Sequence, residues 1–482
     1  MILNYPPPTL VRSGLRLDIS YPPHDGIVSR IRGIVNYLKN EQHVNGTDLV
    51  LIVDGQGTFF QLPPEILIRR FLDIIRKSDE RLRKKYGFAV VEERGVQRRV
   101  QKYSQRVVFG ASKECNSHSK DDIACVTPPK STLPPDIYGF KTDIQPDGRR
   151  NRPRWLDTGA VIGQAADLLP IYERVLQWVL HHSEKDSDKF VLEKLFGQQE
   201  YVRELERRRT SNSWKEFFWG LLGISDASNI TNVHMDLIPG QRYEFGIGVD
   251  YESQLFFNMK RAKDDMEWLR YNNVTQVSKV QMAHGVPREV RLNLPVDIQQ
   301  YAENPFIVRK PEQGEVPRPT LNATLDKLPS PESRRWDNLD LLTNVHSKAV
   351  PVSIHLNGEE ELRLHWWTKM WYYQWSRALL RKYMRTPGGR KHSIAAWLGG
   401  LDWWDQRGGQ GGMWTEDNHW ISYGEICMGV EEKLFDDKLG RWGSEGEGSG
   451  QPRYNKWGHL LWGHGFEEDL ALDNEDEEVE EW

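Results

Sequence analysis

Residues 48–54 read Asp-Leu-Val-Leu-Ile-Val-Asp, and the chain continues with Gly55-Gln-Gly57. An apolar run of this length that ends on a carboxylate and turns on glycine predicts a buried strand of an α/β sheet. Ligands of open α/β sheets bind outside the carboxyl ends of the strands, so Asp54 is expected to lie at a ligand site. A carboxylate there can hold a hard divalent cation, which can in turn hold a diphosphate. The alternative is that Asp54 only caps the loop or the next helix.

Helices and strands are expected to alternate along most of the chain. Apolar residues at helical spacing predict helices over residues 27–38, 63–77, 165–181, 189–208 and 366–383. Apolar runs predict strands over residues 48–54, 106–111, 155–163, 243–250 and 350–355. Two irregular excursions are expected at residues 112–153 and 308–335. This alternation predicts a three-layer α/β domain.

Composition divides the chain into three parts. Residues 1–385 carry the alternating pattern, residues 386–466 form a Trp- and Gly-rich extension, and residues 467–482 form an acidic tail that is expected to be disordered. The net charge of −5 gives no global electrostatic case for binding nucleic acid. No run of eighteen apolar residues predicts a transmembrane segment, and the start of the chain lacks the pattern of a signal peptide.

The cysteines and sequons bear on the cellular compartment. Cys115 and Cys125 lie in one irregular segment and can pair if the compartment is oxidising. Four Asn-x-Ser/Thr sequons begin at positions 45, 229, 273 and 322, a modest excess over chance. These sequons favour a secretory compartment.

Four polar residues are candidates for a functional site. Asp54, Asp250 and His355 each end an expected strand, and Asp188 lies between two expected helices. Carboxylates together with one imidazole suit Mn²⁺, which takes oxygen ligands and accepts a nitrogen. The alternative is that each residue has its own structural role and no common site exists. Asp188 would then cap a helix, Asp250 would form a turn and His355 would be a core histidine.

Six segments, taken in order, resemble the glycosyltransferase domain of lysyl hydroxylases and its fungal relatives, the procollagen glycosyltransferase type. The segments are LVLIVDGQGTFFQLPPE (49–65), VVFGASKECNS (107–117), RWLDTGAVIG (154–163), DSDKFVLEKLFG (186–197), VDYESQLFFNM (249–259) and VSIHLNG (352–358). The resemblance spans roughly residues 45 to 375, and it is the ordered set rather than any single segment that is specific. It implies a GT-A-type, Rossmann-like fold with a mixed sheet, a UDP-sugar donor and residence in the Golgi or endoplasmic reticulum lumen.

The resemblance also implies roles for the nucleotide-binding residues. Asp54 would be the first Mn²⁺ ligand, and His355 would be the ligand from the closing strand. Asn357 and Lys189 would lie beside the donor. A lysine ammonium near the diphosphate could replace part of the charge of a metal, and the alternative is a solvated lysine on the first turn of a helix.

The reacting groups follow from the same resemblance. Asp188 would lie by the sugar or the reacting hydroxyl, and Asp157 would lie near the acceptor where the family usually has Asn. Asp250 would buttress its turn. The expected reaction is transfer of a hexose from a UDP-sugar to a hydroxyl of a protein or glycan.

Three residues and the start of the chain depart from the family pattern. Gly57 stands where the family has a second metal-binding Asp, Asn116 stands in place of the Trp of Cys-Trp-Pro, and Lys189 stands in place of Gln. The first strand of the family, and any upstream membrane anchor, would precede Met1. These departures leave an alternative open, namely a catalytically degenerate glycosyltransferase-fold protein that acts as a binding or scaffolding module.

Overall fold

The computed structural model describes most of residues 27–379, with its larger gaps at 182–186, 211–232, 308–323 and 358–364, and with short strands outside this range. It has an α/β architecture with mixed sheets, as the alternation of helices and strands predicted. Among the described residues, no helix is long and apolar enough to cross a membrane.

A four-stranded mixed sheet forms the centre of the molecule. Its strands are β2 (Leu49–Val53), β7 (Trp155–Gln164), β6 (Val107–Ser112) and β8 (Ile247–Val249), in the order β2-β7-β6-β8. Strand β7 is antiparallel to both β2 and β6, and β6 is parallel to β8. The carboxyl ends of β2, β6 and β8 therefore lie at the same edge of the sheet, which is the edge where ligands of α/β proteins bind.

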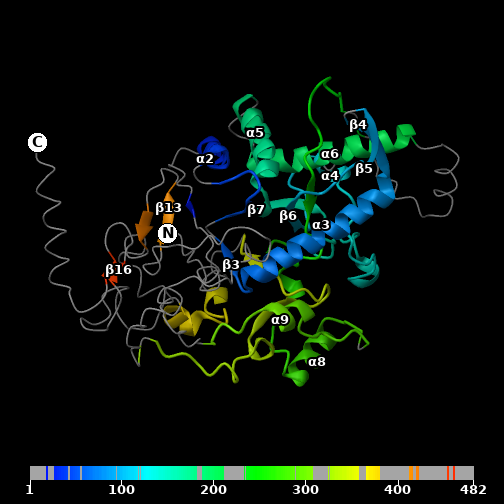
Figure 1. Cartoon of the computed structure of the whole chain (residues 1–482). Helices are drawn as coiled ribbons and strands as arrows, with labels where there is room; N and C mark the ends of the chain where they lie inside the picture. The colour runs from blue at the N-terminus through cyan, green and yellow to red at the C-terminus, as the bar shows by residue number, and fades with distance from the viewer. Residues whose placement is uncertain are drawn as a thin grey trace, which may run out of the picture.

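Helices cover both faces of this sheet (Figure 1). Helices α2 (Ile27–Lys39), α5 (Ala165–His181) and α6 (Asp188–Thr210) share one hydrophobic core with Val107 and Phe109 of β6. Val108 between them belongs to a second core, which includes α3 (Pro64–Tyr86). Successive strand residues point to opposite faces, so this alternation places the sheet between two apolar layers.

A second, smaller sheet packs in the core that contains α3. It consists of β3 (Thr58–Phe60), β12 (Ser353–His355) and β9 (Phe256–Asn258), with β12 in the middle. Strand β12 is antiparallel to β3 and parallel to β9, and His355 pairs with both Thr58 and Asn258. This pairing returns a late segment of the chain to the loop that follows β2.

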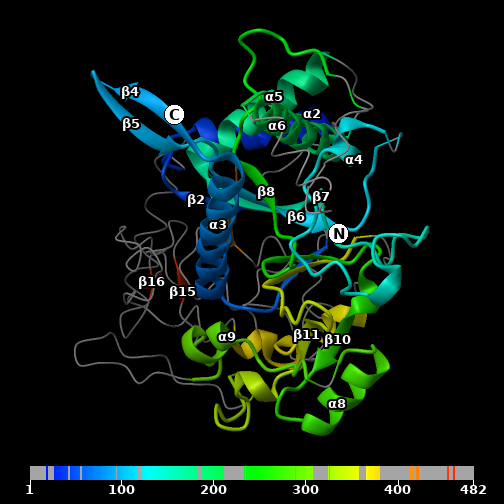
Figure 2. The same ribbon diagram turned by 90° about the vertical axis from the view of Figure 1, so that its right-hand side faces the viewer.

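The remaining elements lie around these two sheets. Strands β10 (Met266–Leu269) and β11 (Leu341–Asn344) form an antiparallel pair, and helix α8 (Val274–Ala283) packs against β10 (Figure 2). Helix α9 (Val296–Tyr301) lies at the lower end of α3 in this view and is joined to it by the ion pair between Arg70 and Asp297. From the C-terminal extension, β13 (Gly412–Thr415) and β14 (Trp420–Ser422) pair with each other, and β13 also pairs with β1 (Asp18–Ile19). Strands β15 (Arg453–Tyr454) and β16 (Leu460–Leu461) form a further pair. The acidic tail and most of the excursion at 308–335 lie outside the described residues.

Several predicted elements differ from the observed ones. The helix predicted over 63–77 continues to Tyr86, and the strands predicted over 243–250 and 350–355 shorten to β8 and β12. The long helix predicted over 366–383 is wrong for its described part, because residues 365–379 form short helical turns that include the 3-10 turn Tyr373–Trp375. The aromatic rings of this segment pack edge to face, as Trp371 does against Phe306 and Trp336.

One hairpin was not predicted. Strands β4 (Phe88–Glu93) and β5 (Val96–Gln101) form an antiparallel pair that projects from the body of the molecule beyond α3 (Figure 2). Gly95 in its turn has a φ of 78°, a conformation that glycine adopts without steric cost.

Candidate functional site

Asp54 and His355 come together at the carboxyl edge of the central sheet. Asp54 follows β2, and its backbone N–H donates to the carbonyl oxygen of Gly159 at 2.8 Å. His355 ends β12 of the second sheet, and its Nε2 lies 3.4 Å from Oδ2 of Asp54. The Asp54 side chain is 46% exposed, whereas that of His355 is 12% exposed. The pair therefore presents a carboxylate to solvent, with a nearly buried imidazole behind it.

The His355 ring lies directly against the backbone of β7. A Cβ atom built on Gly159 would overlap the Nδ1, Cε1 and Cγ atoms of the ring, so only glycine leaves room for it. Nδ1 of the ring lies 3.4 Å from Oδ2 of Asp157. Among the described residues, this nitrogen has no partner at good hydrogen-bond geometry. Burial opposes the charge on the ring, but contacts with Asp157 and Asp54 raise the pKa of His355 to about 9.

Asp157 is a buried carboxylate between two cationic groups. It is 3% exposed, its Oδ1 lies 3.1 Å from Nζ of Lys189, and its Oδ2 accepts a hydrogen bond from the Gly159 N–H at 3.2 Å. Burial raises the pKa of Asp157, but the contacts with His355 and Lys189 outweigh burial and hold this pKa well below its ordinary value. A carboxylate with such a low pKa is a weak proton acceptor, so its contacts suit the positioning of His355 and Lys189.

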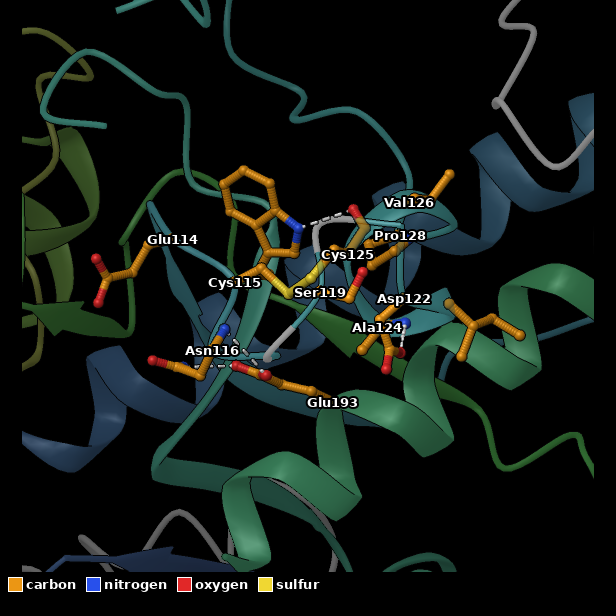
Figure 3. Close-up of a disulfide and its surroundings, with 12 residues drawn as sticks. Glu114, Cys115, Asn116, Ser119, Asp122, Ala124, Cys125, Val126, Pro128 and Glu193 are labelled. Atoms are coloured by element: carbon orange, nitrogen blue, oxygen red, sulfur yellow. Dashed lines mark hydrogen bonds between the residues drawn. A yellow bond between two sulfur atoms is a disulfide. The ribbon is translucent and has the colours of Figure 1, made fainter. Parts of the chain in front are cut away.

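Glu193 is a further acidic residue near this group, and the sequence reasoning missed it. It lies one helical turn after Lys189 on α6 and is 1% exposed. Its carboxylate accepts hydrogen bonds from Nδ2 of Asn116 at 2.8 Å and from the Asn116 backbone N–H at 3.3 Å (Figure 3). Burial raises the pKa of Glu193 to about 7, although Asn116 and the charge of Lys189 oppose the shift. The one signal in the sequence was the spacing of four between Lys189 and Glu193, which places both side chains on the same face of the helix.

A disulfide fixes the loop that carries Asn116. Cys115 and Cys125 are bonded, with their Cα atoms 5.5 Å apart (Figure 3). Cys125 lies in the short helix α4 (Ile123–Val126), and its carbonyl oxygen accepts a hydrogen bond from Nε1 of Trp155 at 3.0 Å. The pairing that the sequence left open is thus formed, and it ties the segment after β6 to α4.

Asp188 and Asn357 lie in the same region with other partners. Asp188, in the first turn of α6, forms an ion pair with Arg30 of α2. Ser187 rather than Asp188 accepts a capping hydrogen bond, which comes from the Phe190 N–H at 3.2 Å. Oδ1 of Asn357 accepts a hydrogen bond from the backbone N–H of Lys260 at 3.1 Å. Within the part of the chain that the structure describes, these contacts direct Asp188 to α2 and Asn357 to the loop that follows β9.

Asp250 serves the turn between β8 and β9. Its Oδ2 accepts hydrogen bonds from the backbone N–H groups of Leu255 at 2.6 Å and Phe256 at 3.1 Å. Burial raises the pKa of Asp250 to about 6 despite these hydrogen bonds. These hydrogen bonds give Asp250 a structural role in the turn.

The donor atoms fit an incomplete metal site. Once the His355 ring has lost its proton, Oδ2 of Asp54 and Nε2 of His355 can both reach one cation. Asp157 behind Nδ1 matches the outer carboxylate that orients many metal-bound histidines. Among the described residues, no group of three or more His, Cys, Asp or Glu side chains is arranged to hold a metal ion. A Cβ built on Gly57 would lie 3.7 Å from Cδ2 of His355. The position where the resembled family has a second metal-binding Asp is therefore next to the imidazole, but here it carries no carboxylate.

Comparison with known proteins assigns no family to the chain. No family model matches it, and no curated protein is significantly similar to it.

Proposed function

We propose that this chain is a glycosyltransferase with a GT-A-type fold, which transfers a hexose from a UDP-sugar to a hydroxyl group of a protein or glycan. The observation that supports the proposal best is the convergence of Asp54 and His355. These residues end strands of two different sheets, yet their side chains approach to 3.4 Å at the carboxyl edge of the central sheet.

The charges in the site suit the departure of a nucleoside diphosphate. A Mn²⁺ ion on Asp54 and His355 would stabilise the negative charge that develops on the diphosphate as the glycosidic bond breaks. Asp157 holds His355 and Lys189 at fixed positions by its two oxygen atoms. The Lys189 ammonium adds positive charge on the same side of the sheet. Asp188, beside Lys189 at the start of α6, is the candidate contact for the sugar or the acceptor.

The direct test is titration calorimetry of the full-length protein with UDP, with and without Mn²⁺. We expect Mn²⁺-dependent binding that falls at least about tenfold in Asp54→Asn, because even outer-shell partners of a metal contribute that much. Asp136→Asn is the matched control, since Asp136 is exposed and lies outside the site. The same samples are assayed for hydrolysis of UDP-glucose and UDP-galactose. Binding of UDP that ignores both Mn²⁺ and Asp54→Asn would contradict the proposal.

A second candidate function is a degenerate transferase fold that only binds a partner. Gly57 and the missing third metal ligand among the described residues favour this alternative. Gly57→Asp distinguishes the two, because its φ is not positive and a new carboxylate would lie beside His355. Its Cβ would lie 3.1 Å from the Leu356 carbonyl oxygen, which must shift by a few tenths of an ångström. Hydrolysis of UDP-sugars by Gly57→Asp but not by the natural protein would favour degeneration.

A further inference from the structure

Glu193 has an environment that a purely structural role does not explain. Its carboxylate is buried on α6, and the hydrogen bonds it accepts come from the neutral amide groups of Asn116. The carboxylates farther along α6 are paired differently, since Glu200 and Glu204 form ion pairs with Arg203 and Arg207. A buried carboxylate without a tightly bound cation is costly, and a group of this kind beside a site is a candidate for a functional residue.

Glu193 and Asn116 lie next to the proposed nucleotide-sugar site. Residues four apart on a helix share a face, so Glu193 is on the same side of α6 as Lys189. Nζ of Lys189 lies 3.1 Å from Oδ1 of Asp157, and Oδ2 of Asp157 lies 3.4 Å from Nδ1 of His355, so this face of α6 is turned towards the site. Asn116 follows β6 at the carboxyl edge of the sheet and is partly exposed.

The Asn116–Glu193 pair keeps unused hydrogen-bonding capacity. A carboxylate has about four acceptor positions, and the two bonds from Asn116 occupy only part of them. The carbonyl oxygen of the Asn116 side chain is a further acceptor. Acceptors of this kind suit the hydroxyl groups of a sugar. The disulfide Cys115–Cys125 fixes the preceding residue, so the pair is held in place before a ligand arrives.

We propose that Glu193 and Asn116 form a subsite that binds hydroxyl groups of the transferred hexose. The inference rests on the proposed function and names the part of the site that would recognise the sugar. The diphosphate would be bound at Asp54, His355 and Lys189, whereas the sugar would be bound through hydrogen bonds at Glu193 and Asn116. Recognition at this position would be polar, because Asn116 stands where the resembled family has an aromatic residue.

The test compares UDP with UDP-glucose and UDP-galactose by titration calorimetry with Mn²⁺ at pH 8, where Glu193 is mostly ionised. We expect Glu193→Gln to weaken binding of at least one UDP-hexose about tenfold, as the loss of a hydrogen bond to a charged group does, and to leave the affinity for UDP unchanged. Glu204→Gln is the matched control, because Glu204 lies on the same helix, is 2% exposed and faces a different ion-pair network. The control variant should bind all three ligands as the natural protein does.

Two results would overturn the subsite. One is equal binding of every ligand by Glu193→Gln and the natural protein, and the other is an equal loss for UDP and both UDP-hexoses. If Glu193→Gln does not fold, Asn116→Ala provides the same comparison at a partly exposed position. A natural protein that binds neither UDP nor a UDP-hexose would instead overturn the proposed function itself, so the two failures are distinguishable.

Discussion

At the residue scale, the contact between His355 and Gly159 controls the geometry of the site. The imidazole occupies the space that any other side chain at position 159 would need. Its two nitrogen atoms face Asp54 and Asp157, so a displacement of the ring changes both contacts at once. The absence of a side chain at position 159 thus allows the second sheet to pack against the central one and sets the position of the proposed metal-binding atoms.

Gly159→Ala is expected to displace the His355 ring. Overpacking of a well-packed interior usually costs about 1–3 kcal/mol, so urea unfolding should show a loss of this size. Binding of UDP with Mn²⁺ should fall together with stability. Gly46→Ala is the control, because its Cβ would meet Ala166 at an ordinary 3.4 Å. Unaltered stability and binding in Gly159→Ala would show that the position of the His355 ring does not require its close contact with Gly159.

Asp250 makes a pH-dependent contribution to stability with a defined sign. Its pKa rises from 3.8 in the unfolded chain to about 6 in the folded protein, so the folded state binds more protons between these pH values. The contribution of Asp250 is therefore most favourable below about pH 4 and is lost as the pH rises towards 6. Asn at this position keeps an oxygen acceptor for the Leu255 and Phe256 N–H groups.

The unfolding free energy of Asp250→Asn, relative to that of the natural protein, should accordingly increase with pH. The difference should grow by up to about 3 kcal/mol between pH 4 and pH 7, since one pKa unit corresponds to about 1.4 kcal/mol. Urea titrations of both proteins across this range measure it. A difference that stays constant with pH would mean that Asp250 titrates normally in the folded protein.

The sequence predicted some site residues and missed others for physical reasons. Asp54 and His355 follow apolar strands, and residues at strand ends can be placed at a sheet edge from sequence alone. The spacing of Glu193 from Lys189 was too weak a signal to identify it, because a glutamate within a helix is usually solvated and only packing shows that this one is buried. The Arg30 partner of Asp188 could not be predicted either, because it comes from a distant helix.

At the scale of elements, the disulfide loop gives a separate prediction. Replacement of both Cys115 and Cys125 by serine removes a crosslink between residues separated by 10 positions. The loss of this constraint should reduce stability by about 3 kcal/mol, measured by urea unfolding. In the subsite proposed here, the double variant should also lose affinity for UDP-hexose more than for UDP. Retention of full stability would show that the contacts of α4 alone hold the loop.

Element prediction from sequence succeeded where one face of an element is buried. Helices α2, α5 and α6 each place apolar residues in one core, and their predicted ranges agree with the observed ones within about two residues. The β4–β5 hairpin was missed because both of its faces are exposed, with Val90, Val91 and Val100 each more than 40% exposed. Without a buried face, the hairpin shows no clear alternation of apolar and polar residues.

At the scale of the whole molecule, the layered arrangement of helices around the central sheet was predictable, but the second sheet was not. A strand was predicted around β12, but its partners β3 and β9 have three residues each, which is too short to show a periodic pattern. Their pairing joins residues that are far apart in the chain. Tertiary packing rather than local sequence therefore determines this sheet.

A ligand that binds at Asp54 and His355 should stabilise the entire fold, because it contacts both sheets. With UDP and Mn²⁺ at about 100 times the dissociation constant, the gain is about 2.7 kcal/mol, which should raise the melting temperature by about 3–4 °C. Differential scanning calorimetry measures the shift, and Asp54→Asn should abolish it. A shift that persists in Asp54→Asn would place the binding site elsewhere.

The return of β12 to the loop after β2 has a consequence for biosynthesis. During translation, Asp54 leaves the ribosome long before His355. The pair of side chains can therefore form only after the roughly 300 residues between them have been made. Premature termination or proteolysis ahead of β12 would yield fragments that retain the central strands yet lack the imidazole. If the proposed function holds, UDP and Mn²⁺ could bind at this site only after synthesis has passed residue 355.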